Sequence, residues 1–285
     1  MKTVYDTHSL RNIVQRWRNN EEKVAFVPTM GNLHDGHLSL LNHARQLADR
    51  TIVSIFVNPI QFGKGEDYEN YPSTLKQDGQ KLSENGADIL FAPNLSQLYP
   101  GGLEEDTRVS VPSLSKILCG KFRPGHFSGV ATVVTKLFFS VLPDIALFGE
   151  KDYQQLLVIR RMVSDLCMPV EIIGQPIIRE SDGLAMSSRN SYLSVDERKR
   201  APAIYRELNA IGEKIIAGDR DFASLEQGSI DNLAAEGFKP EYVSIRRLED
   251  LEEPSGDDDR FSILAAAWLG SARLIDNIKV SLSDD

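Results

Sequence analysis

The sequence predicts an α/β fold in which a Rossmann-like, doubly wound parallel sheet precedes a smaller C-terminal α+β domain. Short apolar runs alternate with stretches of helical period as far as residue 178, which is typical of parallel strands joined by helices. Several of these runs are apolar nearly throughout, as strands covered on both faces should be. The pattern changes beyond that point, so we expect a larger domain at 1–176 and a smaller one at 177–285.

In the larger domain, strands and helices are expected to follow one another in regular order. The predicted strands are 24–27, 51–57, 87–92, 145–148 and 170–178, and the predicted helices are 38–49, 73–85, 130–141 and 152–166. Leu38, Leu41 and Ala44 form one apolar stripe, which indicates a helix lying on the sheet. Because open sheets bind ligands outside the carboxyl ends of their strands, the segments that follow 24–27 and 51–57 should face one cleft.

The smaller domain should begin with a polar turn at 179–190. Two helix-like stretches follow at 202–217 and 222–236, and three strand candidates come after them, at 242–248, 261–269 and 273–280. Helices followed by neighbouring strands are typical of an α+β arrangement.

The 285-residue chain has an ordinary globular composition, with 41% apolar and 26% charged residues. Its net charge of -9 and pI near 5.2 oppose general attraction to nucleic acid, so we expect no nucleic-acid partner. The N-terminus has no apolar signal core and no apolar stretch is long enough to span a bilayer, so we expect a cytoplasmic protein without a membrane partner. Cys119 and Cys167 form no Cys-x-x-Cys pair, which argues against a disulfide framework and a thiolate zinc site.

The most informative segment follows the strand at 24–27 and carries two histidines around a glycine. Leading into the amphipathic stretch from Leu38, it reads Pro28-Thr29-Met30-Gly31-Asn32-Leu33-His34-Asp35-Gly36-His37. We expect a turn between strand and helix here, and the backbone N–H groups at a helix N-terminus lack partners and carry a partial positive charge. Such an end binds phosphate, so the segment is predicted to hold a nucleotide.

Zinc is an alternative ligand for His34 and His37. Zinc-binding helices usually place two histidines four residues apart with a glutamate beside the first, and no third ligand is evident in this sequence. We therefore expect no metal held by the protein alone. His8 and His43 lack a glycine-rich setting, and we expect these two to cap or pack.

Two further segments begin where predicted strands end. Asn58 and Gln61 supply uncharged amides that suit the hydroxyl and carboxylate oxygens of a small polar substrate, although such amides also cap turns. Lys151 stands at a helix start, where the helix dipole disfavours its charge, so an anion is expected nearby. Asp152 can be the N-cap of that helix, and Gln155, one turn on, should face the same ligand.

A second donor cluster is predicted at Met186-Ser187-Ser188-Arg189-Asn190, which offers two hydroxyls and a guanidinium. It lies near the predicted domain junction, where clefts commonly form. We therefore expect the two donor segments to hold one nucleoside triphosphate between them and to support nucleotidyl transfer. The loop around Arg123 and His126 is either a solvated basic turn or a further phosphate contact.

These segments resemble the pantothenate synthetase (pantoate–β-alanine ligase) family of the nucleotidylyltransferase superfamily. The His-x-Gly-His motif of that superfamily stands here as His34-Asp35-Gly36-His37. The resemblance extends over 28–40, 54–62, 123–137, 148–156 and 182–193. It implies ATP-dependent condensation of (R)-pantoate with β-alanine to pantothenate, AMP and pyrophosphate through a pantoyl adenylate, within coenzyme A biosynthesis.

The resemblance also implies the parts of the site. Gln61 and Gln155 correspond to pantoate contacts, Gln61 also lies near β-alanine, and His37 is the proton donor of the family. Mg2+ should bridge the ATP phosphates, held largely by substrate oxygens and water, and a homodimer is expected. Residues 1–176 would bind the nucleotide and 177–285 would form a lid. The implied ATP site comprises Met30, Gly31, Asn32, Leu33, His34, Asp35, Gly36, His37, Gly149, Glu150, Lys151, Asp152, Ile178, Met186, Ser187, Ser188 and Arg189.

The chemistry of adenylation calls for positioning and charge stabilisation without a covalent nucleophile, because a carboxylate and a phosphate, both anions, must approach each other. Three alternatives stay open from the sequence: another nucleotidylyltransferase, a non-catalytic nucleotide- or RNA-binding module, and a zinc hydrolase that uses the histidine pair. The predicted donors to phosphate oxygens are His34, His37, Lys151, Ser187, Ser188 and Arg189.

Overall fold

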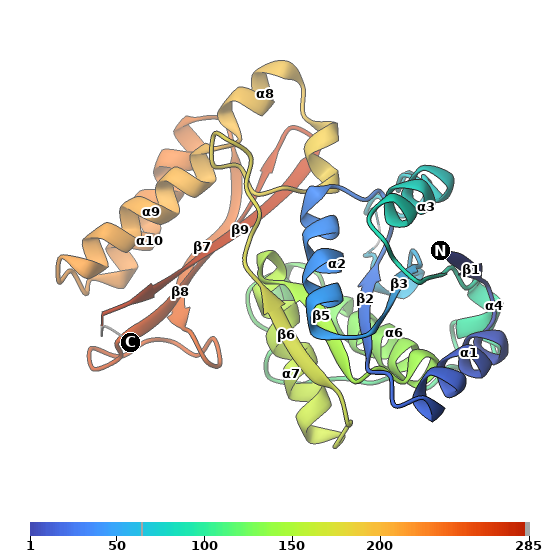
Figure 1. The fold of residues 1–285 in the computed structure, drawn as a ribbon. Coiled ribbons are helices and arrows are strands. Elements are labelled where there is room, and N and C mark those ends of the chain that lie inside the picture. Colours follow the sequence, from blue (N-terminus) through green and yellow to red (C-terminus); the bar gives the residue numbers. More distant parts are fainter. Residues whose placement is uncertain (64, 283–285) are drawn as a thin grey trace. The chain divides into compact units, whose positions relative to one another are not determined.

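The structure is a computed structural model that describes residues 1–63 and 65–282 (Figure 1). Its contacts divide the chain into two compact units. The first unit comprises Met1–Glu150 and Val158–Pro176, and the second unit comprises Lys151–Leu157 and Ile177–Asp285. The short segment Lys151–Leu157 thus groups with the second unit. The division into domains at 1–176 and 177–285 stays a prediction.

The first unit contains a six-stranded sheet of order β1-β4-β3-β2-β5-β6 with parallel pairing from each strand to the next (Figure 1). The strands are β1 Lys2–Val4, β2 Val24–Thr29, β3 Arg50–Ile55, β4 Ile89–Phe91, β5 Ile145–Gly149 and β6 Glu171–Gln175. The chain winds from β2 through β3 to β4 on one side and from β5 to β6 on the other, so the order reverses between β2 and β5. This confirms the predicted doubly wound parallel sheet. Its expected ligand position is the carboxyl end of β2 and β5, where Thr29 and Gly149 end their strands.

Helices cover both faces of this sheet. On one face, Leu41 of α2 and Leu82 of α3 share a core with Val27 of β2. On the other face, the ring of Phe26 in β2 makes an edge contact with Phe138 of α6. Alternate residues of β2 therefore face opposite helical layers, which explains why the strand is apolar throughout. The helices are α1 Thr7–Asn19, α2 Asp35–Leu47, α3 Leu75–Glu84, α4 Leu95–Leu98, α5 Cys119–Phe122, α6 His126–Val141 and α7 Tyr153–Asp165, whose first residues belong to the second unit.

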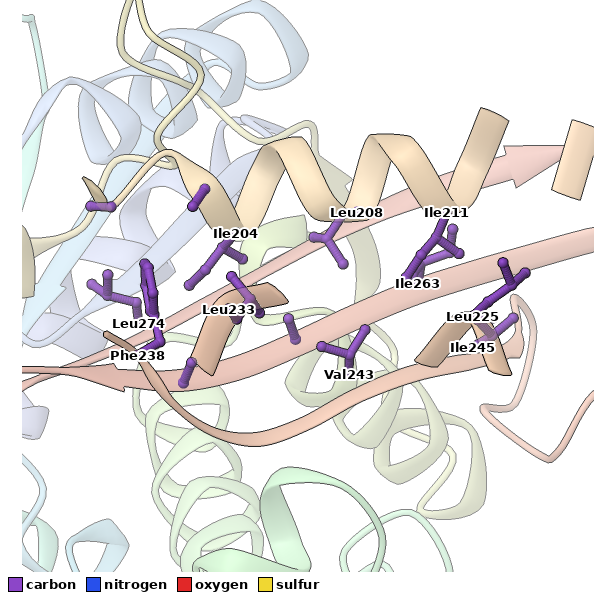
Figure 2. Packing of buried hydrophobic residues seen from close by; sticks show 14 of the residues in the cluster. Ile204, Leu208, Ile211, Leu225, Leu233, Phe238, Val243, Ile245, Ile263 and Leu274 are labelled. Carbon is purple, nitrogen blue, oxygen red and sulfur yellow. The ribbon is translucent and has the colours of Figure 1, made fainter. Parts of the chain in front are cut away.

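The second unit contains a three-stranded antiparallel sheet, β7-β8-β9, covered by helices. Its elements are α8 Val195–Arg200, α9 Ala203–Ile216, α10 Phe222–Ala235, β7 Lys239–Arg247, β8 Arg260–Leu269 and β9 Ala272–Ser281. Figure 2 shows Ile204, Leu208 and Ile211 of α9 facing strand residues such as Ile263 and Leu274 in one buried cluster. Their spacing places them on one stripe of the helix, and burial of this stripe holds the predicted α+β domain together.

Several elements differ from the expectations. β1 and α1 lie outside the predicted elements; the apolar stripe of α1 is short, and its start is capped by Asp6, which accepts a hydrogen bond from the N–H of Ser9 at 2.8 Å. β6 ends at Gln175 and not at residue 178. The helix predicted from Leu38 begins at Asp35 because side chains of the histidine segment cap it.

Candidate functional site

The loop that follows β2 is held by a buried carboxylate of α3. Asp78 is 1% exposed, and its two oxygens accept hydrogen bonds from the backbone N–H groups of Asn32 and Leu33, both at 2.9 Å. The hydroxyl of Thr74 donates to the same carboxylate at 2.8 Å. Asn32 has a φ of 50°, in the left-handed region that asparagine tolerates better than most residues. Asp78 therefore sets the path of the chain into His34.

His34 and His37 form a capping box at the start of α2. Nδ1 of His34 accepts a hydrogen bond from the N–H of Gly36 at 3.2 Å, and Nδ1 of His37 accepts one from the N–H of His34 at 3.4 Å. Since each Nδ1 accepts, the proton of each neutral ring is on Nε2, from which it can be donated to a ligand. The sequence suggests that His8 and His43 cap or pack, and the structure shows capping at His34 and His37.

Gln61 ends a short 3-10 turn, η1 (Pro59–Gln61), that follows β3. Its amide N–H group donates to Sδ of Met30 at 3.0 Å. Asn58 is 1% exposed, and its Nδ2 donates to Oε1 of Gln61 and to the carbonyl of Gly129, both at 3.1 Å. The hydroxyl of Tyr99 donates to Oδ1 of Asn58 at 2.8 Å. Asn58 thus orients the amide of Gln61, and the substrate contact predicted for Asn58 stays a prediction.

The basic loop around Arg123 and His126 is also tied to Gln61. The guanidinium of Arg123 donates to both carboxylate oxygens of Glu66, at 2.6 and 2.5 Å, and Nη1 lies 3.0 Å from Nε2 of His126. Nδ1 of His126 lies 2.7 Å from the carbonyl oxygen of Gln61. Burial by itself would raise the pKa of the Glu66 carboxyl, but the hydrogen bond and charge of Arg123 outweigh it and lower that pKa. The charge of Arg123 is matched by Glu66, and the phosphate contact predicted for this loop stays a prediction.

In the second unit, Lys151 lines a small pocket together with Ser187, Asn190 and Asp276. Lys151 lies in a 3-10 turn, η2 (Glu150–Asp152), directly before α7. Burial lowers the pKa of the Lys151 ammonium, and the positive charge of Arg189 acts in the same direction. An anionic ligand in contact with Lys151 would favour its charged form. The anion expected near the lysine stays a prediction.

The segment of two serines and an arginine begins the 3-10 turn η3 (Ser188–Tyr192). Ser187 is its N-cap, and its hydroxyl accepts a hydrogen bond from the N–H of Arg189 at 3.3 Å. The N–H of Met186 donates to the carbonyl of Ile178 at 3.0 Å, which closes the loop that precedes the serines. The structure thus brings Ile178 next to Met186, and Ser187 to the pocket of Lys151.

The other predicted contacts lie along the transition from β5 to α7. Gly149 ends β5, Glu150 and Asp152 flank the lysine in η2, and Gln155 lies in the first turn of α7. Asp152 directly precedes the first residue of α7, which is the position predicted for its N-cap. The expectation that donors of the first and second units surround one nucleotide stays a prediction.

The sequence motifs do not identify the residues that hold the proposed donors in place. Glu66, Asp78, Asp276 and Asn277 belong to no recognised motif, yet each makes hydrogen bonds to a donor segment or its support. Asp78 stands four positions before Leu82 on the buried face of α3, and Asp276 and Asn277 interrupt an apolar strand. Charged residues are almost never fully buried unless paired, so polar residues at core positions are the signal that could have found them.

Comparisons with known proteins give one consistent family. Residues 2–279 match the family described as pantoate-beta-alanine ligase. The chain is 53% identical over 283 residues to the pantothenate synthetase of Azotobacter vinelandii, with 99% of this chain and 100% of that protein covered. Among the residues that the structure describes, every helix is too short or too polar to span a bilayer.

Solved structures agree with this assignment. The pantothenate synthetase from Thermus thermophilus is 48% identical with a TM-score of 0.91, and 98% of this chain and 99% of that chain are covered. The pantoate-beta-alanine ligase from Francisella tularensis, complexed with β-γ ATP and β-alanine, is 36% identical with a TM-score of 0.81 over 98% of this chain and 97% of that chain. A family match over nearly the whole sequence, together with relatives above half identity, shows that the chain belongs to the pantoate-β-alanine ligase family.

Proposed function

We propose that this chain condenses (R)-pantoate with β-alanine to pantothenate and converts ATP to AMP and pyrophosphate through an enzyme-bound pantoyl adenylate. The observation that carries the proposal is family membership over residues 2–279. The histidine pair, Lys151 and the 187–189 segment supply the N–H and O–H donors that adenylation needs. The Francisella tularensis relative, complexed with β-γ ATP and β-alanine, supports two of the three substrates. The product would enter coenzyme A biosynthesis.

In the first step, a carboxylate oxygen of pantoate attacks the α-phosphorus of ATP. The bond from that phosphorus to the bridging oxygen of the β-phosphate breaks, and pyrophosphate leaves with the electron pair. Because negative charge moves onto the departing oxygens, fixed donors lower the barrier. We assign this role to His34, His37, Lys151, Ser187, Ser188 and Arg189 acting on the same ATP, with His37 also as proton donor.

Lys151 suits this role because it is half-buried and lines a small pocket with Ser187. The folded protein lowers the pKa of its ammonium, so the charge is poorly compensated before an anion arrives. Contact with phosphate oxygens would supply the missing compensation. The charge-assisted hydrogen bond is then made at a half-buried position, and it is stronger there than at a fully exposed surface.

In the second step, the amine of β-alanine attacks the acyl carbon of the adenylate. The carbon–oxygen bond to AMP breaks, AMP leaves with that oxygen, and the new amide nitrogen loses a proton. Gln61 and Gln155 are proposed to hold pantoate, with Gln61 also near β-alanine. The hydrogen bonds to Gln61 from Asn58 and at its carbonyl from His126 restrict its movement, which favours a fixed reacting geometry.

The proposed ATP contacts run along 30–37, 149–152, 178 and 186–189. Among the described residues, no group of three or more His, Cys, Asp or Glu side chains could hold a metal ion. The donor set of lysine, arginine, serine and imidazole suits phosphate oxygens, so Mg2+ would be held by ATP oxygens and water and would neutralise phosphate charge. We also propose that 1–176 binds the nucleotide and that 177–285 serves as a lid.

A homodimer in the cytoplasm is part of the same proposal. The dimer rests on the family resemblance, and the proposed dependence on ATP supports the location. Analytical ultracentrifugation of the purified chain and fractionation of cells that express it test these two points.

Pantoate labelled with ¹⁸O in its carboxylate tests the proposed function. If the carboxylate attacks the α-phosphorus, each AMP released with pantothenate carries one ¹⁸O atom from pantoate. AMP without label, while pantothenate still forms, would contradict the adenylate. Failure to form pantothenate, with labelling of AMP by another acceptor, would assign the chain to a different nucleotidyl transfer.

A further inference from the structure

Two neighbouring residues of β9, Asp276 and Asn277, are buried in the second unit, with 5% and 3% of their surfaces exposed. Adjacent side chains of a strand point to opposite faces of its sheet, so both faces of the sheet carry a polar group at this level. A buried polar group is costly unless it is hydrogen-bonded. The partners of these two side chains therefore show what they hold in place.

Asn277 holds the turn that carries Lys151. Its Nδ2 donates a hydrogen bond of 3.0 Å to the carbonyl oxygen of Lys151. Two residues further on, the hydroxyl of Tyr153 donates to the carbonyl of Leu248 at 2.9 Å. Both contacts lie within the second unit, so Lys151 and the start of α7 are fixed to the same body as β9.

Asp276 holds the loop that leads to the two serines. Its carboxylate accepts hydrogen bonds of 2.6 and 2.9 Å from the guanidinium of Arg179, which also donates to the carbonyl of Gly183 at 3.0 Å. The guanidinium carbon lies 3.7 Å from the ring centroid of Tyr205. Arg179 pairs with Ala185 in a β-bridge, directly before Met186 and the serines. The ion pair is thus at the base of the loop that presents this donor segment.

We infer that Asp276 and Asn277 are positioning residues that set the spacing between Lys151 and the donors at 187–189. The identity of the ligand that these donors bind rests on the proposed function, whereas the positioning itself rests on the contacts described above. Consecutive Cα atoms are about 3.8 Å apart, so one peptide unit of a buried strand connects the two supports. Donors that stabilise transition-state charge must be held within about 0.5 Å of their productive position, and two adjacent buried residues of a strand that is hydrogen-bonded to β8 provide such rigidity.

Asn277→Ala tests the support of Lys151 directly. We expect kcat of pantoate-dependent pyrophosphate exchange to fall about tenfold while the KM for pantoate changes little, because the lysine is present but less well held. Ser262→Ala is the matched control. Ser262 is a buried polar residue of neighbouring β8 whose Oγ has no hydrogen-bond partner among the described residues. Its removal should leave the rate unchanged.

A double-mutant cycle with Lys151→Met separates positioning from general stability. If Asn277 acts through Lys151, Asn277→Ala should lower kcat by less than about twofold once the lysine is replaced. The same cost in both backgrounds would overturn the inference. The pair Asp276→Leu with Arg179→Met removes both charges together, so that no buried charge is left unpaired. A folded double variant with the wild-type rate would overturn the part assigned to Asp276.

Amide hydrogen exchange provides a readout that needs no substrate. Exchange along 151–157 should be faster in Asn277→Ala than in the wild type or in Ser262→Ala. Unchanged exchange would overturn the inference even if activity falls. If the wild-type protein shows no pantoate-dependent pyrophosphate exchange, the proposed function fails, and the amide measurement still decides whether Asn277 holds the lysine turn.

Discussion

The imidazole rings of His34 and His37 together cap the start of α2, with ring centroids 4.1 Å apart and both Nδ1 atoms accepting backbone N–H groups. In each neutral ring Nδ1 acts as the hydrogen-bond acceptor in the cap, so the ring proton is on Nε2. One arrangement therefore serves the stability of the helix and the proposed donation to phosphate. The two roles can be separated by substitution.

His34→Asn should keep the cap and lose the donor at the imidazole Nε2 position, because the shorter amide side chain places its N–H groups elsewhere. Asparagine is a favourable N-cap, so the unfolding free energy should stay within about 0.5 kcal/mol of the wild type. The rate of adenylation should fall about 10- to 100-fold because a charge-assisted hydrogen bond is lost. His34→Ala should show the same loss of rate and lose about 1 kcal/mol of stability as well. Urea denaturation and pyrophosphate exchange measure the two effects, and a wild-type rate in His34→Asn would remove the donor role.

Lys151→Met should stabilise the protein at neutral pH by about 1 kcal/mol while lowering the rate of adenylation about 100-fold. Burial lowers the pKa of the Lys151 ammonium, which means that the folded state disfavours its charge. Methionine fills similar space without that cost. A variant that is less stable than the wild type at neutral pH would contradict this account of the site.

The same substitution should change the pH dependence of stability. Between the lowered pKa and the usual lysine value of 10.5, the unfolded chain binds a proton on Lys151 that the folded chain does not. The unfolding free energy of the wild type therefore rises with pH across that interval, and Lys151→Met should lack this contribution. Denaturation at a series of pH values measures the difference, and identical slopes for the two proteins would count against it.

Asp78→Asn should disturb the loop before the histidines. Asp78 now accepts hydrogen bonds from two backbone N–H groups, and the new side-chain amide would turn its own N–H group toward one of them. We therefore expect the unfolding free energy to fall by about 2 kcal/mol and the rate of adenylation to fall at least about tenfold. Asp88→Asn is the control, because Asp88 also accepts a backbone N–H, from Thr51 at 2.8 Å, at the beginning of β3. It should lower the melting temperature and leave kcat intact. Equal effects on kcat would show that Asp78 has no special link to the site.

Gly129→Ala should move Gln61. A Cβ at Gly129 would lie 2.6 Å from the carbonyl of Ile60 and 2.7 Å from Cα of Gln61, closer than atoms can pack. We expect the KM for pantoate to rise and stability to fall by about 1 to 3 kcal/mol. Gly228→Ala in α10 meets no atom within 4 Å and should stabilise the protein by up to about 1 kcal/mol. Steady-state kinetics and thermal melts compare the pair, and an unchanged KM in Gly129→Ala would argue against Gln61 as a pantoate contact.

The alternation of strands and helices could be predicted because its signal is local. Val24–Thr29 is apolar on both faces, and the stripes of α2 and α9 repeat at helical spacing. The start of α2 at Asp35 could not be predicted, because the helix is capped by imidazole nitrogens and not by a Ser, Thr, Asp or Asn side chain. Hydrophobic periodicity does not report such side-chain to backbone bonds.

The candidate donors could be predicted from motifs, but their supports could not. Asp78 is 46 residues from Asn32 in the sequence, and Asn277 is 126 residues from Lys151. Such pairs meet only because the strands and helices between them fold. Their only local trace is a polar residue at a buried position, which does not identify its partner.

The most direct test of the central claim is exchange of labelled pyrophosphate into ATP with pantoate present and β-alanine absent. The account predicts exchange that requires pantoate and that falls about 10- to 100-fold when His37, Lys151 or Arg189 is replaced by an uncharged residue without a donor. Exchange that proceeds equally without pantoate, or only when β-alanine is added, would contradict adenylation of pantoate as the first step.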